Sequence, residues 1–499
     1  MMKFKISISI LFALFFLPGS LQSQDNDTLR LSLKNAVDLA ILQSSSVRYS
    51  QNRNVNYYWR WQNFKTRFRP QLTLRGNLPN YTRTTEENMQ DDGSIKFNQI
   101  ANLKTSATLS LNQQIARTGT YIYAATSLTR IEDYNYNTVD YASTPFSVGF
   151  VQPIFAYNWS KWAKRTEPLL FEEANKNFIE EIEEISLAAT RRFFRYLKVQ
   201  TNFNLAKSNL ANSQDNLKIA EAKKKLGQIS ENDFSRIKLS VFNAQKALNK
   251  ASMDLKNADF ELKSYINLDQ NQNIDLEIPL NMVLFDIDED KALEEAIANR
   301  KETPRFERRL IQADRELEQA KRNSGLSATL RGSYGVSNSA ELLPQVYENP
   351  ETQQVVRLTL EVPILDWGRS ASAIKLAESE RELIVYDVEK DRRDFRRGVI
   401  VQVEQFKLLE DQLTTAEEAD KVAENGYQIA LKKFQNGEIS ITDLNISLAE
   451  RESAKRDYIQ SLEDYWEAYY NLRILTLYDF ELNKKITYGN PMLDESINK

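Results

Sequence analysis

The sequence predicts a mainly helical protein built from two copies of one plan, in which a strand pair is followed by a long coiled-coil helical hairpin. Three observations lead to this prediction. Short motifs recur in the same order along the chain, and the hydrophobic period changes within each copy from two to about 3.5 residues. Residues that form turns are scarce: the 499 residues include only 14 glycines and 12 prolines, so the elements between turns must be long.

Cysteine and histidine are both absent from the sequence. Disulfides, thiolate and imidazole metal sites, cysteine nucleophiles and histidine-based catalytic triads are therefore excluded. The formal net charge of −4 lacks the basic character typical of nucleic-acid binding. Carboxylate or lysine chemistry remains possible, but no phosphate loop, paired carboxylate motif or metal constellation stands out. We therefore expect a protein that is not an enzyme, holds no cofactor or metal ion, and binds no nucleic acid.

Residues 1–23 have the pattern of a secretory signal peptide. Lys3 and Lys5 precede an apolar run from Ile6 to Leu17, and small residues follow it. No later stretch stays apolar and uncharged for the roughly 18 residues that a membrane-spanning helix needs. Since no cysteine is present for lipid anchoring, we expect an exported chain that is either soluble or inserted in a membrane as a β-barrel.

Three motifs occur twice and in the same order. Thr-Leu-Arg-Gly lies at 73–76 and 329–332, Gln-Pro-Ile-Phe at 152–155 corresponds to Val-Pro-Ile-Leu at 362–365, and Gly-Gln-Ile-Ser at 227–230 corresponds to Gly-Glu-Ile-Ser at 437–440. The last two pairs share an offset of 210 positions, whereas the first pair is offset by 256. The first copy therefore carries an insertion of about 46 residues between its first strand and its Gln-Pro element.

The predicted domain organisation follows from these motifs. It consists of a signal peptide (1–23), a first repeat (24–268), a linker rich in Asn, Gln and Asp (269–287), a second repeat (288–480) and a C-terminal tail (481–499). Each repeat is expected to contain a short helix, a strand pair and a long helical hairpin, with the inserted residues in the first.

Apolar and polar residues alternate in the strand regions. At 72–75 leucine alternates with threonine and arginine, and the segments 107–112, 146–150 and 357–362 follow the same pattern. Such strands have one apolar and one polar face. Two interpretations stay open at this point: the apolar face is the core of a soluble sandwich, or it faces lipid around a membrane barrel with a polar interior.

Long helices are expected after each strand region. Residues 169–278 contain no proline and a single glycine, and residues 364–490 again contain no proline. Apolar residues recur there every three or four positions, which is typical of amphipathic helices with coiled-coil character. The turns of the two hairpins are expected at Gly227 and Gly437, because glycine readily adopts the left-handed conformation that ends a helix.

This order of elements resembles the TolC-like outer-membrane efflux proteins. The resemblance rests on the opening helix at 31–37, the Gln-Pro and Val-Pro elements, and the two Gly-x-Ile-Ser tips, and it covers nearly the whole exported chain. It implies a homotrimer in which strands of three protomers close one β-barrel through the outer membrane of a Gram-negative bacterium, while the helices form a tunnel through the periplasm. Closure also removes the open sheet edges that lipid does not tolerate.

The resemblance further implies a passive channel in a tripartite efflux or type I secretion system, which exports small toxic compounds, drugs or proteins. The partners implied are a periplasmic adaptor (membrane fusion) protein, an inner-membrane efflux pump or ABC transporter, and outer-membrane lipid. An alternative from another class is an exported coiled-coil scaffold or adhesin without pore activity, whose strands form an ordinary soluble sheet.

The insertion departs from the family pattern. Its alternating segments at 107–114 and 120–129 could lengthen a surface loop or add a hairpin to the barrel. We expect four membrane strands per protomer, with the inserted residues outside the barrel. The second copy also has Leu326 where the first has Pro70, the residue that usually opens the first strand in this family.

The resemblance implies a pore gate just beyond the second tip. Asp443 matches the first aspartate of the family's constriction, but Ile446 stands where a second is expected. A ring of Asp443 carboxylates would favour cations and could bind a polyvalent cation as a plug, and a ring of Ile446 would gate by dewetting. The alternative is that Asp443, like Asp233, only stabilises the positive end of its helix.

The two hairpin tips have two interpretations, and their residues are Gly227, Ile229 and Ser230 in the first copy and Gly437, Ile439 and Ser440 in the second. The first interpretation is turn chemistry, in which each serine caps the returning helix. The second, implied by the resemblance, is a docking surface for the adaptor, to which exposed isoleucines are suited.

The strand-to-helix junctions are marked by Pro153 in the first copy and by Pro363 and Trp367 in the second. Tryptophans at these points would either anchor a barrel at the level of the lipid headgroups or pack where the strand turns into the helix. The same two interpretations apply to Trp159 and Trp162.

Overall fold

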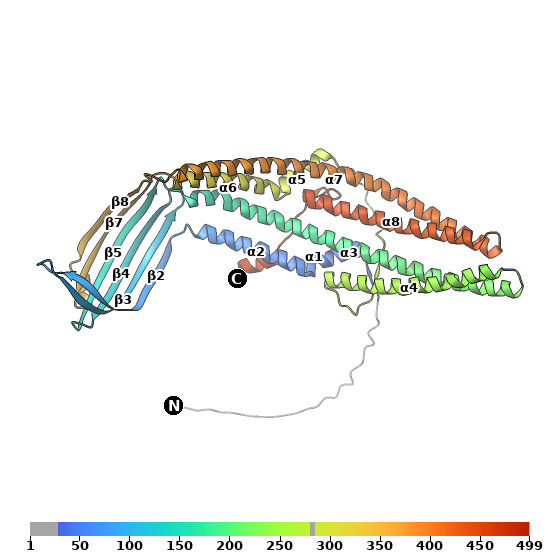
Figure 1. The fold of residues 1–499 in the computed structure, drawn as a ribbon, viewed down its shortest axis with the longest axis horizontal. Helices are drawn as coiled ribbons and strands as arrows, with labels where there is room; N and C mark the ends of the chain where they lie inside the picture. The colour runs from blue at the N-terminus through green and yellow to red at the C-terminus, as the bar shows by residue number, and fades with distance from the viewer. Residues whose placement is uncertain (1–27, 280–284, 499) are drawn as a thin grey trace, which may run out of the picture. The chain divides into compact units, whose positions relative to one another are not determined.

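The computed structural model describes residues 28–279 and 285–498 (Figure 1). The predicted signal peptide at 1–23 lies outside the described residues. The described residues divide into two compact units, the first made of residues 28–39 and 192–279 and the second of residues 40–191 and 285–498. Helices α1 (Leu33–Gln43) and α3 (Trp159–Lys225) each contribute to both units.

The first unit contains a helical hairpin and a short strand pair. The hairpin consists of the C-terminal part of α3 and of α4 (Glu231–Ile266). β1 (Leu29–Leu31) pairs in parallel with β6 (Ile274–Leu276), which lies within the predicted linker. The largest fully buried side chains of the two helices are Phe193, Phe194, Leu197, Leu262 and Ile266.

The second unit contains one antiparallel sheet with the strand order β2-β3-β4-β5-β7-β8 (Figure 1). The strands are β2 (Gln71–Met89), β3 (Ile95–Ile115), β4 (Thr120–Asp133), β5 (Thr138–Ile154), β7 (Ser327–Ala340) and β8 (Glu351–Glu361), and the short helix η1 (Leu343–Tyr347) connects the last two. Both repeats therefore contribute to the same sheet, the first with four strands and the second with two.

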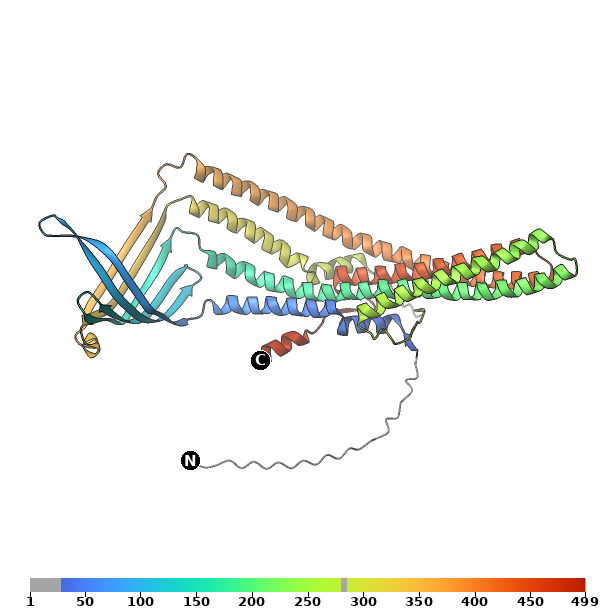
Figure 2. The ribbon, with the colours of Figure 1, turned by 60° about the horizontal axis from the view of Figure 1, so that its bottom comes forward.

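The expectation that the inserted residues lie outside a four-stranded arrangement is wrong. They form β3 and β4, which continue the backbone pairing between β2 and β5. Their alternation has the same period as that of the neighbouring strands, so the sheet extends without a change of face. The β2–β3 hairpin also runs past the end of β4, since β3 pairs with β4 only from Asn102 onward, and Figure 2 shows this ribbon projecting beyond the other strands.

Close contacts between neighbouring strands require glycine at two positions. Gly149 is paired with Tyr123, and a Cβ atom at Gly149 would lie 2.5 Å from the tyrosine hydroxyl. Gly332 is paired with Phe150, and a Cβ atom there would lie 2.6 Å from the ring. The aromatic side chains thus cover the glycines across the strand pairs, which fixes the register of three neighbouring strands.

The sheet has one apolar and one polar face. Strand alternation and the register together assign the residues to faces. The apolar face contains Leu72, Leu74, Leu109, Leu111, Val148, Phe150, Leu330, Leu358 and Leu360. The polar face contains Thr73, Arg75, Ser110, Asn112, Ser147, Thr329, Arg331, Arg357 and Thr359. The apolar face is largely uncovered: Leu74 is 73 % exposed and Leu360 is 60 % exposed.

The helices of the second unit are α2 (Ser45–Thr66), the N-terminal part of α3, α5 (Glu289–Asn299), α6 (Glu302–Asn323), α7 (Arg369–Asn436), α8 (Ile441–Thr476) and α9 (Pro491–Asn498). α7 packs against both α6 and α8. The strands β9 (Tyr478–Asp479) and β10 (Lys484–Lys485) form a short antiparallel pair. α3 begins about ten residues earlier than the proline-free segment and contains Pro168.

A buried cluster of charged residues joins α3 to α8 within the second unit. Glu183 on α3 is 0 % exposed, and its carboxylate accepts hydrogen bonds from Arg473 Nε at 2.8 Å and Nη2 at 2.9 Å. Arg473 also pairs with Asp479, and the Tyr488 hydroxyl donates to Glu183. Burial acts to lower the pKa of Arg473, but the hydrogen bonds and charge of Glu183 outweigh it and raise that pKa. Both charges are thus compensated where they are buried.

The predicted fold class is confirmed: the protein is mainly helical, and each repeat combines strands with a long helical hairpin. Among the described residues, no helix is both long enough and apolar enough to cross a membrane.

Candidate functional site

The tip of the α7–α8 hairpin is built by local turn chemistry. Gly437 ends α7 in the left-handed conformation, with a φ of 82°, and its N–H donates to the carbonyl of Phe434 at 3.0 Å. The Ser440 hydroxyl then accepts the N–H of Asp443 at 3.2 Å and caps α8. The α3–α4 tip repeats this plan, with Gly227 at a φ of 67° and Ser230 capping α4. The predicted turns and caps are therefore present at both tips.

The tip isoleucines are less accessible than the docking interpretation assumed. Ile439 is half-buried, because it packs against a small cluster of Tyr427, Ala430 and Leu444 that forms a local core at this tip. Ile229 is also half-buried. Ile439 is thus used by the core of its own hairpin, and neither isoleucine is fully exposed at its tip.

The most exposed large apolar residue of the α3–α4 tip is Leu226, which is 71 % exposed. Leu226 is not among the tip residues predicted from the sequence. The sequence feature that could have identified Leu226 is its position directly before Gly227, where the second copy has the polar Asn436. The two tips therefore differ in the chemistry that they offer to a partner.

Asp443 lies at the surface and takes part in a capping box. Its Oδ2 accepts the Ser440 N–H at 3.0 Å and the Ser440 hydroxyl at 2.7 Å. These hydrogen bonds hold the pKa of Asp443 below its ordinary value. Ile446, three residues further along α8, is 53 % exposed, so the two side chains emerge on the same side of the helix. Asp443 therefore helps to cap α8. The gate remains a prediction for Asp443 and Ile446.

The strand-to-helix junctions differ between the copies. Pro153 lies within β5, opposite Thr329 of β7, whereas Pro363 follows the end of β8. Trp367 is 90 % exposed and has a φ of 56°, and Phe155 has a similar φ of 62° at the other junction. Of the two interpretations for Trp367, packing at the junction has no support, because this side chain is almost fully solvent-exposed in the single chain.

Asp366 accepts backbone hydrogen bonds at the start of α7, beside Trp367. Its carboxylate accepts the N–H of Gly368 at 3.0 Å and that of Ser370 at 2.8 Å. Hydrogen bonds from Ser370 hold the pKa of Asp366 below its ordinary value. Ile364, at 95 % exposure, and Leu365 precede it, so the second junction presents a short exposed apolar run beside a fixed helix start.

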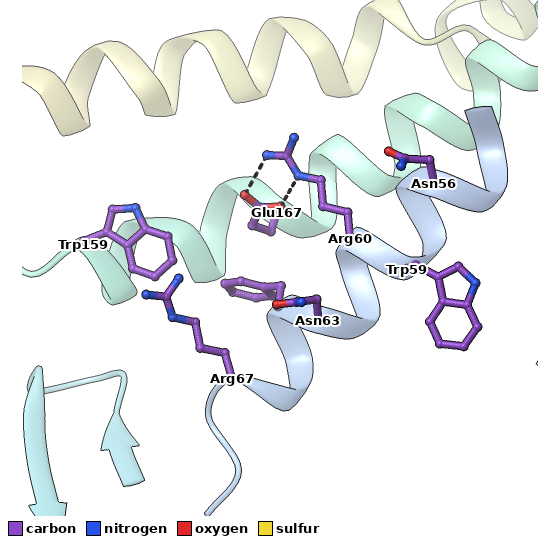
Figure 3. A pocket seen from close by; sticks show the side chains of 8 residues that line it. Asn56, Trp59, Arg60, Asn63, Arg67, Trp159 and Glu167 are labelled. Carbon is purple, nitrogen blue, oxygen red and sulfur yellow. Dashed lines mark hydrogen bonds and ion pairs between the residues drawn. The ribbon is translucent and has the colours of Figure 1, made fainter. Parts of the chain in front are cut away.

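A surface pocket lies between α2 and α3 near the first junction (Figure 3). Arg60 donates to Glu167 through Nε at 3.4 Å and Nη2 at 3.2 Å. The guanidinium of Arg67 lies over the Trp159 ring, 4.5 Å from its centroid. Both arginines of this pocket are therefore already engaged, Arg60 with a carboxylate and Arg67 with an aromatic ring. Within the part of the chain that the structure describes, no group of three or more acidic residues could hold a metal ion.

Both edges of the sheet are open in the single chain. Every residue of β2 and of β8 is exposed, and each strand pairs on one side only. The outer side of each carries a row of unpaired backbone N–H and C=O groups. The alternating pattern predicts strands but not which of them form the edges, since register and order depend on pairings between distant segments.

Comparison with known proteins agrees with this architecture. Residues 292–476 match the family model described as outer membrane efflux protein. No curated protein matches the chain. Among solved structures, the CmeC outer membrane channel of Campylobacter jejuni is 14 % identical with a TM-score of 0.65, covering 94 % of this chain and 89 % of that one. The outer membrane protein VceC of Vibrio cholerae is 12 % identical with a TM-score of 0.62, covering 91 % and 97 %.

These matches show the fold of the chain and a likeness in sequence over part of it. The fold is that of outer-membrane channel proteins over nearly the whole length of the chain, and the second repeat carries the sequence pattern of an outer membrane efflux protein. The resemblance to the TolC-like outer-membrane efflux proteins is thereby confirmed.

Proposed function

We propose that this protein is the passive outer-membrane duct of a tripartite efflux or type I secretion system and acts as a homotrimer. The observation that carries the proposal is the sheet of the second unit, with two open edges, one uncovered apolar face and one polar face. An apolar face toward lipid and a polar face toward water is the pattern of a membrane barrel. A soluble scaffold or adhesin would leave the same apolar face in contact with water.

The direction of the edge strands supports closure by copies of the chain. All neighbouring strands are antiparallel, so β2 and β8 run in opposite directions. β8 of one copy can therefore pair with β2 of the next and continue the antiparallel alternation. Three copies would supply eighteen strands, and closure leaves no edge exposed to lipid.

The long hairpins suit the passage of cargo through the periplasm. In this proposal the helices of three copies line a tunnel, and the tips meet a periplasmic adaptor protein. An inner-membrane efflux pump or ABC transporter supplies the energy, and the cargo is small toxic compounds, drugs or proteins. Leu226 is the tip side chain best suited to an apolar contact with the adaptor, because it is not used by its own hairpin core.

Asp443 and Ile446 are proposed to form the gate. They lie on one side of α8, and the capping hydrogen bonds keep the Asp443 carboxylate charged at neutral pH. A ring of these carboxylates would bind a polyvalent cation, and the Ile446 ring beside it would resist wetting when narrow.

The absence of cysteine allows a direct test of the edge pairing. One cysteine replaces Thr73 on β2, and a second is moved along the polar face of β8 through Gln353, Val355 and Thr359. Oxidation of membranes should give covalent dimers and trimers for one of these registers, with no larger species. The matched control places the second cysteine at Ser147 on the central strand β5, where no cross-link between copies is expected. Equal cross-linking in the control, or monomers throughout, contradicts the proposal.

Planar-bilayer recordings test conduction and the gate. We expect discrete, long-lived current steps that a polyvalent cation blocks from one side. Asp443→Asn should weaken this block, whereas Asp233→Asn, which alters the equivalent cap of α4, should leave it intact. A block that is unchanged in Asp443→Asn removes this residue from the gate. A folded, membrane-inserted trimer that stays silent under all conditions overturns the duct.

A further inference from the structure

The repeated Thr-Leu-Arg-Gly motif places an arginine at the same position in both copies. Arg75 is the fifth residue of β2, and Arg331 is the fifth residue of β7. Both strands start at the end of the sheet where the helices join. Both arginines lie on the polar face and are exposed. The motif therefore delivers a positive charge to one face of the sheet at a similar depth in each repeat.

A third arginine doubles the charge in the second copy. Arg357 is the fifth residue from the end of β8 and is the direct cross-strand partner of Arg331. Side chains directly opposite each other in an antiparallel pair have Cβ atoms about 5 Å apart, and like charges at this distance are unfavourable. The pairing brings together two groups that repel unless an anion lies between them or beside them.

The described part of the chain supplies no such anion. Neither Arg331 nor Arg357 forms an ion pair within it. Their neighbours on the polar face are uncharged: Val151 beside Arg331, and Thr359 and Val355 flanking Arg357. The nearest acid on this face is Glu361, four residues further along β8. By contrast, Arg130, on the opposite face of the sheet, is paired with Glu132 at 2.8 Å.

We propose that Arg75, Arg331 and Arg357 form a cationic ring on the inner wall of the barrel that concentrates small anionic solutes, such as carboxylates, sulfates and phosphates. This inference rests on the proposed duct, because closure by three copies repeats the arginines around the lumen. Rings of arginine select anions in pores, and the planar guanidinium binds such groups in a bidentate manner. The duct would thus carry an acidic gate at Asp443 and a basic ring in its β-sheet segment.

The test measures the local potential without requiring conduction. Thr329→Cys puts a thiol on the polar face next to Arg331 in a chain without other cysteines. The full-length protein in membranes is treated with an anionic and a cationic methanethiosulfonate of similar size, and the ratio of the two reaction rates is recorded. Each unpaired charge about 8 Å from the thiol changes the rate of a singly charged reagent by roughly twofold in water.

The ratio of the anionic to the cationic reaction rate should fall about tenfold or more when Arg331→Gln and Arg357→Gln are introduced together. The loss of positive charge slows the anionic reagent and speeds the cationic one, so the two effects multiply in the ratio. The effect should shrink at 1 M salt, where the screening length is about 3 Å. Arg130→Gln is the control for the other face, where it removes one positive charge, and it should leave the ratio unchanged. A Leu330→Cys thiol on the apolar face should be insensitive to the double variant.

The outcomes separate this inference from the proposed function. A ratio that is the same with and without the two arginines, or that responds equally to Arg130→Gln, overturns the cationic ring even if the protein conducts. A ratio that falls as expected, in a protein that carries no current, shows that Arg331 and Arg357 attract anions locally, but it contradicts the duct and with it overturns the ring. In a conducting trimer, the reversal potential in a salt gradient should shift toward cation selectivity in the double variant.

Discussion

Replacing Arg473 with methionine should strongly destabilise the second unit. The substitution removes both hydrogen bonds to Glu183, whose carboxylate is 0 % exposed, and leaves that charge with the Tyr488 hydroxyl as its remaining partner. Breaking a buried ion pair from one side costs about 3–5 kcal/mol. Asp479 contributes less to the loss, because its Oδ1 still accepts the N–H of Leu482 at 2.9 Å.

The double variant Glu183→Gln with Arg473→Met tests the origin of this cost. The uncharged amide keeps an oxygen for the Tyr488 hydroxyl, so we expect it to restore at least half of the lost free energy of unfolding. Thermal unfolding at a fixed scan rate is the assay, since the membrane trimer proposed above is not expected to unfold reversibly. The control is Lys421→Met, which removes an exposed ion pair with Glu417 and should cost less than about 1 kcal/mol.

Two results would refute this reasoning. If Arg473→Met unfolds within about 1 kcal/mol of the unmodified protein, the cluster does not hold α3 and α8 together. If the double variant is as unstable as the single one, the cost arises from lost packing of the arginine stem and not from an uncompensated charge.

Three further predictions concern the tips and the sheet. Gly437→Val should lower the free energy of unfolding by about 1–2 kcal/mol through backbone strain alone, since φ at this position is 82° and no atom would lie within 4 Å of an added Cβ atom. Amide exchange over 434–441 should become faster, and Gly437→Asn should have a milder effect. The stability that the Asp443 cap contributes should be fully present above the ordinary pKa of 3.8 and be lost as the pH falls through the lowered folded-state pKa. Amide exchange at the start of α8 should follow this pH dependence, and Ser440→Ala should abolish the dependence. Gly149→Ala should lower the free energy of unfolding by about 1–3 kcal/mol and reduce heat-resistant oligomers, because the added methyl would lie 2.5 Å from the Tyr123 hydroxyl. Gly325→Ala is the control and should have neither effect, since its added methyl would lie 3.5 Å from the nearest atom.

The tips could be predicted from the sequence because their physics is local. Gly437 and Ser440 lie three residues apart, and the conformations they favour depend on their own backbone and side chain. The helices were predictable for a similar reason, since the period of apolar residues reports a buried face without naming its partner. The accessibility of Ile439 was not, because its burial depends on Tyr427 and Leu444, which belong to two different helices.

The sheet and the charged cluster depend on distant segments. Arg331 and Arg357 look like isolated basic residues until the register places them opposite each other. Glu183 and Arg473 are 290 positions apart, and each resembles one more charge on a solvated helix. The inserted residues had the alternation of strands, yet only their pairing with β2 and β5 shows that they widen the sheet from four strands to six.

The two open edges of the sheet also limit how long a single copy can safely exist. Until β2 and β8 are paired, each is a template onto which any extended segment can add, and the uncovered leucines beside them favour such additions. Correct assembly needs copies to meet with matching edges, whereas faulty strand addition can start with any neighbour. Overproduction should therefore raise the risk of aggregation in competition with the ring closure proposed above. A cell that makes this protein has to keep the unassembled chains dilute or escorted until their edges have met.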